Sequence, residues 1–214
     1  MKTLHCGKVF LVGAGPGDPE LLTLKAVRAI AQADVLLVDD LVNPLVLEHA
    51  RRDARIVQVG KRGGCQSTPQ QFIERLMVSE SLAGNVVVRL KGGDPFMFGR
   101  GGEEIAALEA AGIEYEVLNG ITAGLAGPTS VGIPLTHRDF CHGVAFITGH
   151  TKSEKNDAPA TVTGSGAHAG YLYGNFQFIG NCQRAECPWH APQHANRGDS
   201  RRDIAKSAGI DLHA

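Results

Sequence analysis

The chain has 214 residues and a formal net charge of −1 at pH 7, with 21 Lys and Arg against 22 Asp and Glu. This balance argues against nucleic acid and anionic membranes as partners, although a cleft can still concentrate charge for an anionic small molecule. No apolar run reaches the roughly 18 residues of a membrane helix, and the N-terminus lacks a signal peptide's apolar core. The five Cys show no disulfide-like spacing, so we expect a protein of the reduced cytoplasm.

The apolar composition changes sharply near residue 151. Ile, Leu and Val account for 41 of the first 150 residues but for only 6 of the remaining 64. A packed core becomes doubtful when the large apolar side chains fall below roughly 20% of a segment. We therefore expect the ordered core to lie within the first 150 residues.

Strands and helices alternate along these 150 residues. A buried-type strand at Val9–Val12 leads into a Gly-rich turn, after which Asp18 is expected to cap a helix with Pro19 in its first position. Thr68 and Gln71 have the spacing of a capping box for another helix. Further strands are expected at residues 35–38, 55–59, 86–90, 114–118 and 144–148, and further helices at 44–51, 68–82 and 103–111. This alternation predicts an α/β fold with a parallel-type sheet and helices on both faces, and a ligand site beyond the carboxyl ends of the strands.

The first turn, "GAGPGDP", has its glycines at positions 13, 15 and 17. This is G-x-G-x-G rather than the dinucleotide pattern G-x-G-x-x-G, and Asp18 would repel a phosphate at the helix N-terminus. A loop for an adenosyl or other small ligand is favoured over a dinucleotide loop or a turn made only for packing. Asp39 and Asp40 end the second strand, either as a general base facing the cleft or as caps of the next helix.

The stretch "RLKGGDPFMFGRGGEE" is the most informative in the chain. Its paired glycines predict a loop whose backbone approaches a ligand, with Phe96 and Phe98 pointing inward. Glu104 is expected to be a solvated loop charge. A set of cations is predicted at the loop ends, as suits a polycarboxylate substrate. Its members are Lys61, Arg62, Lys91, Arg100, His137 and Arg138.

Six segments resemble the tetrapyrrole methylase family, and within it the uroporphyrinogen-III C-methyltransferases. In chain order they are "VGAGPGDPELLTLKA", "VDDLV", "VGKRGG", "VRLKGGDPFMFGRGGEE", "GITAG" and "GIPLTHRD" with "TGH". The resemblance covers residues 8–150. It implies a two-domain α/β fold, a homodimer and S-adenosylmethionine bound between the domains. The implied reaction is the C-methylation of uroporphyrinogen III to precorrin-2, on the routes to sirohaem and cobalamin.

The resemblance also implies roles for individual residues. Asp39 resembles the family's proton acceptor and Lys61 its proton donor, with Arg100 a rival for the base. Glu103 and Arg138, together with Arg100, would hold the tetrapyrrole. The methyl-donor site would be lined by Pro16, Gly92, Gly93, Asp94, Met97, Thr122 and Ala123. The chain departs from the family at Asn119, where a Pro is usual before "GIT", and this change is expected to loosen the Thr122 loop.

Two strands of the resembling family, of the types TLVIYMG and TPxAxI, are absent after "TGH". Read one base later, the codons of residues 168–178 permit Thr-Leu-Val-Ile-Phe-Met-Gly-Ile-Ser-Asn-Leu, which contains the first missing strand. Those of residues 193–199 permit Asn-Thr-Pro-Ile-Ala-Val-Ile. Both motifs therefore return in one alternative frame, in family order. Our hypothesis is a frameshift between about Lys152 and His168, against the alternative of a truly diverged tail.

The expected organisation follows from these observations. Residues 1–134 form an N-terminal α/β domain, residues 135–152 begin a second α/β domain, and residues 153–214 are an anomalous, poorly ordered tail. We expect methyltransferase activity to be impaired. The competing functions are a methylase of a later cobalamin precursor and a non-catalytic domain that binds tetrapyrrole or methyl donor. A zinc site in the tail, from Cys182, Cys187, His190 and His194, is disfavoured because no hydrophobic pattern surrounds the crowded ligands, so we expect no metal.

Overall fold

The computed structural model describes residues 7–60, 68–139, 143–147, 167–171 and 179–180. The chain divides into two compact units, Met1–Thr122 and Ala123–Ala214, which are treated separately below. The domain limits expected from the sequence, at residues 134 and 152, stay predictions.

Unit 1 is built on a five-stranded parallel sheet in the order β3-β2-β4-β1-β5. The strands are β1 (Val9–Gly13), β2 (Val35–Val38), β3 (Arg55–Gln58), β4 (Val87–Lys91) and β5 (Tyr115–Leu118). Every residue of β1, β2 and β4 is buried, because these central strands are covered on both faces. The predicted parallel sheet and all five of its predicted strands are confirmed.

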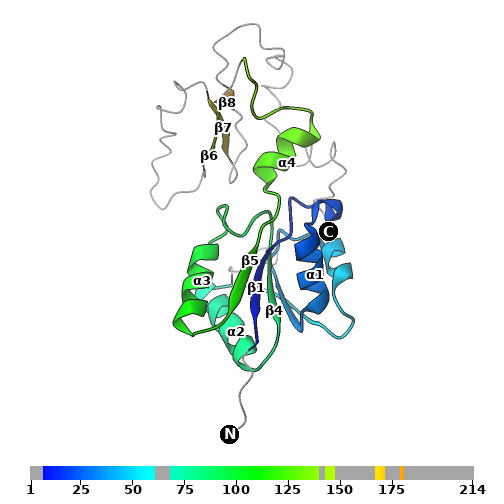
Figure 1. The fold of residues 1–214 in the computed structure, drawn as a ribbon, viewed down its shortest axis with the longest axis vertical. Helices are drawn as coiled ribbons and strands as arrows, with labels where there is room; N and C mark the ends of the chain where they lie inside the picture. The colour runs from blue at the N-terminus through cyan, green and yellow to red at the C-terminus, as the bar shows by residue number, and fades with distance from the viewer. Residues whose placement is uncertain (1–6, 61–67, 140–142, 148–166, 172–178, 181–214) are drawn as a thin grey trace. The chain divides into compact units, whose positions relative to one another are not determined.

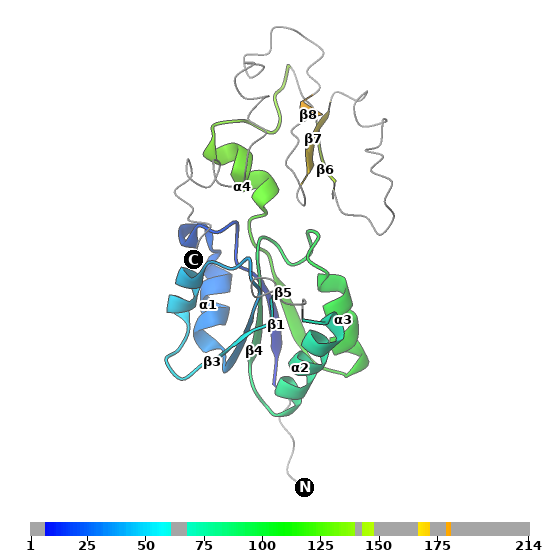
Figure 2. The ribbon, with the colours of Figure 1, turned by 180° about the vertical axis from the view of Figure 1, so that it is seen from behind.

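Helices cover both faces of this sheet (Figures 1 and 2). On one face, α1 (Leu24–Gln32) packs Ala26, Ala29 and Ile30 against the even-numbered side chains of the central strands. On the other face, α2 (Gln70–Leu82) and α3 (Gly101–Ala110) pack against the odd-numbered ones. Alternation of side chains along a strand therefore separates two apolar layers, and residues such as Arg89 belong to the α2 and α3 side.

Two predicted helix starts are wrong. Asp18 caps only a short 3₁₀ turn, η1 (Pro19–Leu21), because Leu22 is extended and Thr23 caps α1 by accepting a hydrogen bond from the Ala26 N–H. The expected capping box at α2 is absent, since Pro69 is the N-cap residue and makes no side-chain cap. The segment expected as a helix at residues 44–51 is a 3₁₀ helix, η2 (Pro44–His49).

Unit 2 contains α4 (Ala123–Ser130) and a small sheet in the order β6-β7-β8. Strand β6 (Gly143–Ile147) confirms the strand expected at residues 144–148 to within one residue, and it pairs in parallel with β7 (Ala167–Tyr171). Strand β8 (Ile179–Gly180) is antiparallel to β7. β7 lies where the alternative reading frame would encode the missing strand. The expectation of poor order in the tail falls mainly on residues outside the described ones.

Candidate functional site

Three glycine-containing loops converge at the carboxyl edge of the unit 1 sheet, after β1, β4 and β5. Gly15 and Gly93 exchange two backbone hydrogen bonds of 3.2 and 2.7 Å. A Cβ placed on Gly13 would lie 2.5 Å from the Gly120 nitrogen and 2.6 Å from the Gly93 carbonyl oxygen. Glycine is needed here because the three backbones touch one another directly.

Asp94 holds two of these loops together through both carboxylate oxygens. Oδ1 accepts from the Phe96 N–H at 2.8 Å, which forms a turn within the β4 loop. Oδ2 accepts from the Gly120 N–H at 3.1 Å and from Asn119 Nδ2 at 3.2 Å, both in the β5 loop. Asn119 therefore joins the two loops through its side chain, a contact that Pro could not make.

Most of the predicted site residues of unit 1 gather at this edge. Pro16 lies in the turn after β1, Asp39 directly follows β2, and Thr122, which is buried, ends the β5 loop. The β4 loop and the start of α3 carry Gly92, Gly93, Asp94, Met97, Arg100 and Glu103. Ala123 begins α4 and Arg138 is an exposed residue, and both belong to unit 2. Lys61 and Arg62 lie outside the described residues.

The Arg100 backbone stands in the left-handed region, with φ 57°, and Phe98 has φ 54°. Such conformations are costly for residues other than glycine and often mark functional loops. The guanidinium of Arg100 binds both oxygens of Glu103, at 2.9 and 2.5 Å. This hydrogen bonding raises the pKa of Arg100, so the side chain keeps its proton. The prediction that Phe96 and Phe98 point inward is wrong, since they are 57% and 37% exposed.

Behind the edge lies a buried ionic cluster, formed by Arg89, Lys91 and Glu104, that the sequence analysis missed. The expectation that Glu104 is solvated is wrong, because this residue is 0% exposed. Its Oε1 accepts from Arg89 Nε at 3.0 Å and from Lys91 Nζ at 3.1 Å. Lys91 is therefore buried in an ion pair with Glu104, and the prediction that it is a cation available to a substrate is wrong. Burial, and next the charge of Arg89, lower the pKa of Lys91 despite the nearby carboxylate. The sequence did contain a signal for this cluster. Arg89 and Lys91 stand two positions apart in a strand whose other residues are apolar, so both side chains point to the same face of the sheet.

Neither of the two aspartates after β2 caps the helix that follows. The cap of η2 is Asn43, whose Oδ1 accepts from the Leu45 N–H. Asp39 Oδ1 accepts from the Asp40 N–H at 3.0 Å, and its Oδ2 lies 3.8 Å from Arg89 Nη2. The reading of Asp39 as a cap of the next helix is thus wrong, while its reading as a general base stays a prediction.

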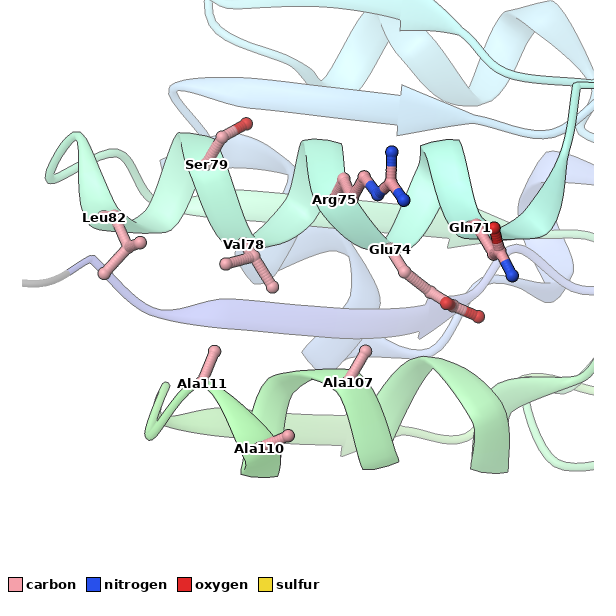
Figure 3. A pocket seen from close by; sticks show the side chains of 9 residues that line it. All are labelled: Gln71, Glu74, Arg75, Val78, Ser79, Leu82, Ala107, Ala110 and Ala111. Carbon is pink, nitrogen blue, oxygen red and sulfur yellow. The ribbon is translucent and has the colours of Figure 1, made fainter.

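A shallow groove of about 450 Å³ lies away from this edge, between α2 and α3. Figure 3 shows the two helices side by side, with Val78 of α2 and Ala107 of α3 along the space between them. None of the predicted site residues lines it. Within the described residues no three His, Cys, Asp or Glu are grouped to hold a metal, and no helix there could span a bilayer. The Cys and His of the predicted zinc pattern lie outside those residues.

The arrangement of loops and the parallel sheet agree with comparisons to known proteins. The family described as Tetrapyrrole (Corrin/Porphyrin) Methylases matches residues 8–175. The chain belongs to this family.

Individual relatives show which members of the family this chain resembles in sequence. A uroporphyrinogen-III C-methyltransferase of Pseudomonas aeruginosa is 61% identical over 160 residues, which are 75% of this chain and 65% of that protein. The chain thus spans less than two thirds of that relative's length. The crystal structure of a Thermus thermophilus uroporphyrin-III C-methyl transferase complexed with S-adenyl homocysteine is 48% identical. Its TM-score is 0.58, and the match covers 68% of this chain and 60% of that one.

A more distant solved structure is that of a cobalt precorrin-4 methyltransferase from cobalamin biosynthesis. It has a TM-score of 0.64 but only 26% identity, and the match covers 77% of this chain and 67% of that one. The likeness in fold therefore extends to this cobalamin enzyme, whereas the likeness in sequence is higher to the two enzymes named for uroporphyrin or uroporphyrinogen III.

Proposed function

We propose that unit 1 binds S-adenosylmethionine at the carboxyl edge of its sheet, and that the chain descends from enzymes that methylate uroporphyrinogen III to precorrin-2. The observation that carries this proposal is the convergence of the loops containing Gly13, Gly93 and Gly120 at that edge. The relative solved with S-adenyl homocysteine, at 48% identity, supports the choice of methyl donor.

The residues at this edge fit such a donor. Gly13, Gly93 and Gly120 let the backbones of the three loops meet, so that a ligand at this edge would lie against loop backbone beside the buried Thr122. Pro16, Gly92, Gly93, Asp94 and Met97, with Thr122 and Ala123, would line the site. When bound, the donor supplies a methyl group already activated on a sulfonium. No protein nucleophile is then required, and the chain's part is to position the acceptor carbon and manage its proton.

Asp39 is our candidate for the proton acceptor, and Lys61 for the proton donor. Arg100 is the weaker candidate base, because its pairing with Glu103 raises its pKa and a base must be able to give up its own proton first. Because Arg100 keeps its positive charge, it is better suited to binding the carboxylates of a tetrapyrrole than to acting as a base. We assign Arg100, Glu103 and Arg138 to substrate binding.

A methylase of a later cobalamin precursor is the second candidate, favoured only by the shared fold of the cobalt precorrin-4 enzyme. Its 26% identity, against 61% for the Pseudomonas aeruginosa relative, supports the first candidate. A non-catalytic binding domain is the third candidate.

We further propose that the intact protein is a cytoplasmic homodimer. We also propose that methyl transfer by this chain is impaired because its tail does not supply the family's second domain.

Calorimetry with S-adenosylmethionine, followed by a methyl-incorporation assay with uroporphyrinogen III, tests these proposals on the full 214-residue chain. We expect saturable binding of the methyl donor with little methyl transfer. Gly102→Ala is a suitable control, since a Cβ there meets nothing within 4 Å. Absence of binding at millimolar donor would refute the site, and full turnover would refute the impairment.

A further inference from the structure

The buried ionic cluster of Arg89, Lys91 and Glu104 has no part in the function proposed so far. Arg89 and Lys91 project from β4 to the α2 and α3 side and are 3% and 4% exposed. Glu104, in the first turns of α3, is fully buried. Burying charge is costly unless it is paired, and an apolar cluster of similar shape would often be as stable. The cluster therefore calls for an explanation beyond stability.

The guanidinium of Arg89 is fixed on two sides. Its Nε donates to Glu104 Oε1 at 3.0 Å, and its Nη1 donates to the carbonyl oxygens of Leu37 and Leu90, each at 3.3 Å. The third nitrogen, Nη2, lies 3.8 Å from Asp39 Oδ2. Because Asp39 Oδ1 accepts from the Asp40 N–H, the Asp39 carboxylate is aligned from both ends.

The charge of the cluster balances only when Asp39 is counted. Arg89 and Lys91 bring two positive charges, and both lie beside the single carboxylate of Glu104. That carboxylate is itself shared among several donors, since Oε1 also accepts from Gln70 Nε2 at 3.4 Å and Oε2 lies 3.1 Å from Lys91 Nζ. Among the described residues, Asp39 is the further carboxylate within ion-pair distance of Arg89. The Asp39 carboxylate supplies the second acidic group of the balance.

We propose that Arg89, anchored by Glu104, is a positioning residue that holds the Asp39 carboxylate in a fixed orientation at the end of β2. The proposal rests on the proposed function in that it gives the oriented Asp39 the use of accepting the substrate's proton. Arg89 touches neither substrate nor donor and acts through Asp39. Glu104 fixes Arg89 from the opposite side, so that a residue buried behind the sheet edge sets the orientation of the partly exposed Asp39 side chain.

The test observes each partner while the other is changed, in the full chain and without ligand. In protein labelled with ¹³C at the Asp carboxyls, the Asp39 resonance is identified by its loss in Asp39→Asn. We expect Arg89→Met to shift this resonance and Arg89→Lys to restore part of the wild-type position. Lys8→Met is the matched control, because it breaks ion pairs with Glu114 and Glu116 at the opposite edge of the same sheet.

A second measurement, on an Asp39 variant, tests the same pairing if Arg89→Met fails to fold. Asp39 is 32% exposed, so Asp39→Asn is expected to fold, and it should shift the Arg89 Nε–H resonance. Where methyl transfer is measurable, Arg89→Met should lower kcat about tenfold with little change in the donor KM, and it should add no further loss to Asp39→Asn.

Unchanged resonances in both directions would overturn the pairing, and additive losses of kcat would overturn the positioning role. If calorimetry finds no binding of the methyl donor, the proposed function fails, whereas the resonances still decide whether Arg89 and Asp39 are coupled. The two failures are thereby distinguishable.

Discussion

Asp94 shows how a single side chain can organise a site at the residue scale. Its carboxylate accepts hydrogen bonds from the Phe96 N–H, the Gly120 N–H and Asn119 Nδ2. The sequence led us to expect that Asn119, standing where the family has Pro, would loosen this loop. In the structure, Asn119 instead donates a hydrogen bond to Asp94, and this contact joins the β4 and β5 loops.

Replacing Asp94 is expected to cost much more stability than replacing Asn119. Asp94→Ala leaves two backbone N–H groups without their acceptor and should lower the free energy of unfolding by about 2 kcal/mol. Asn119→Ala removes one exposed bond and should cost less than about 1 kcal/mol. Urea unfolding of the two variants measures the difference. Equal losses would contradict the assignment of Asp94 as the link between the loops.

Lys91 makes stability depend on pH in a direction set by its burial. Burial and the charge of Arg89 lower the pKa of Lys91 below its ordinary value of 10.5. Between the lowered pKa and 10.5 the unfolded chain binds more protons than the folded chain. The contribution of Lys91 to the free energy of unfolding therefore rises with pH across that window. We expect the stability of the wild type relative to Lys91→Met to rise there and to be constant below it.

Urea unfolding at a series of pH values, for the wild type and Lys91→Met, checks this expectation. Lys25→Met serves as the control, because the Lys25 side chain is 74% exposed and its replacement removes a lysine charge without disturbing the buried cluster. A relative stability that falls as pH rises through the window would show that the charged form of Lys91 is favoured by folding.

The error at Glu104 explains why some site residues could not be predicted from the sequence. A glutamate in the first turn of a helix is usually solvated, where it also favours the helix dipole. Its burial here depends on Arg89 and Lys91, whose side chains leave β4 on the face that α3 covers. The local sequence pattern does not show that this strand and this helix are in contact. Asp39 and the glycine loops were predictable because they follow strands directly, and parallel strands end at a common edge.

At the scale of elements, the strands were predicted better than the helix starts. Four-residue apolar runs such as Val35–Val38 indicate strands buried on both faces, and these runs were confirmed. The start of α1 was missed because Asp18 and Thr23 are both good caps, and only the extended backbone at Leu22 decides between them. Competing local caps cannot be ranked without the packing of the helix on the sheet.

The close contact of three loops predicts a strong contrast between two glycines. A Cβ on Gly120 would overlap the Gly93 carbonyl oxygen and lie 2.8 Å from the carbonyl carbon of Gly13. Gly120→Ala must therefore separate the loops, and it should lower the free energy of unfolding by about 2 kcal/mol or more and abolish methyl-donor binding. Calorimetry and urea unfolding measure both effects.

Gly102→Ala is the matched change in a neighbouring element. Gly102 lies in α3 and has open space around a Cβ, so Ala should stabilise the helix by up to about 1 kcal/mol and leave binding unchanged. If both variants behaved alike, the contact between the loops would not be what requires glycine at position 120.

At the scale of the whole molecule, the first 122 residues form a compact unit with its own two-layered core. The family match ends at residue 175, and the chain covers 65% of the Pseudomonas aeruginosa relative. The family match therefore continues past the break in composition near residue 151 and past the interval in which the frameshift is expected.

The frameshift hypothesis makes the last prediction. We expect the gene, sequenced across codons 145–214, to contain a single-base insertion or deletion between codons 152 and 168. Correcting it should encode Thr-Leu-Val-Ile-Phe-Met-Gly in place of the segment that begins at β7 (Ala167–Tyr171). The corrected chain would regain a continuous apolar strand beside β6 (Gly143–Ile147), where burial contributes about 25 cal/mol per Å².

The corrected protein should therefore resist proteolysis beyond residue 150 and transfer methyl groups, whereas the chain as written should do neither. Mass spectrometry of the fragments left by limited proteolysis, together with the methyl-incorporation assay, compares the two proteins. A frame confirmed as written, with protease-resistant structure extending to residue 214, would instead establish the tail as a diverged second unit.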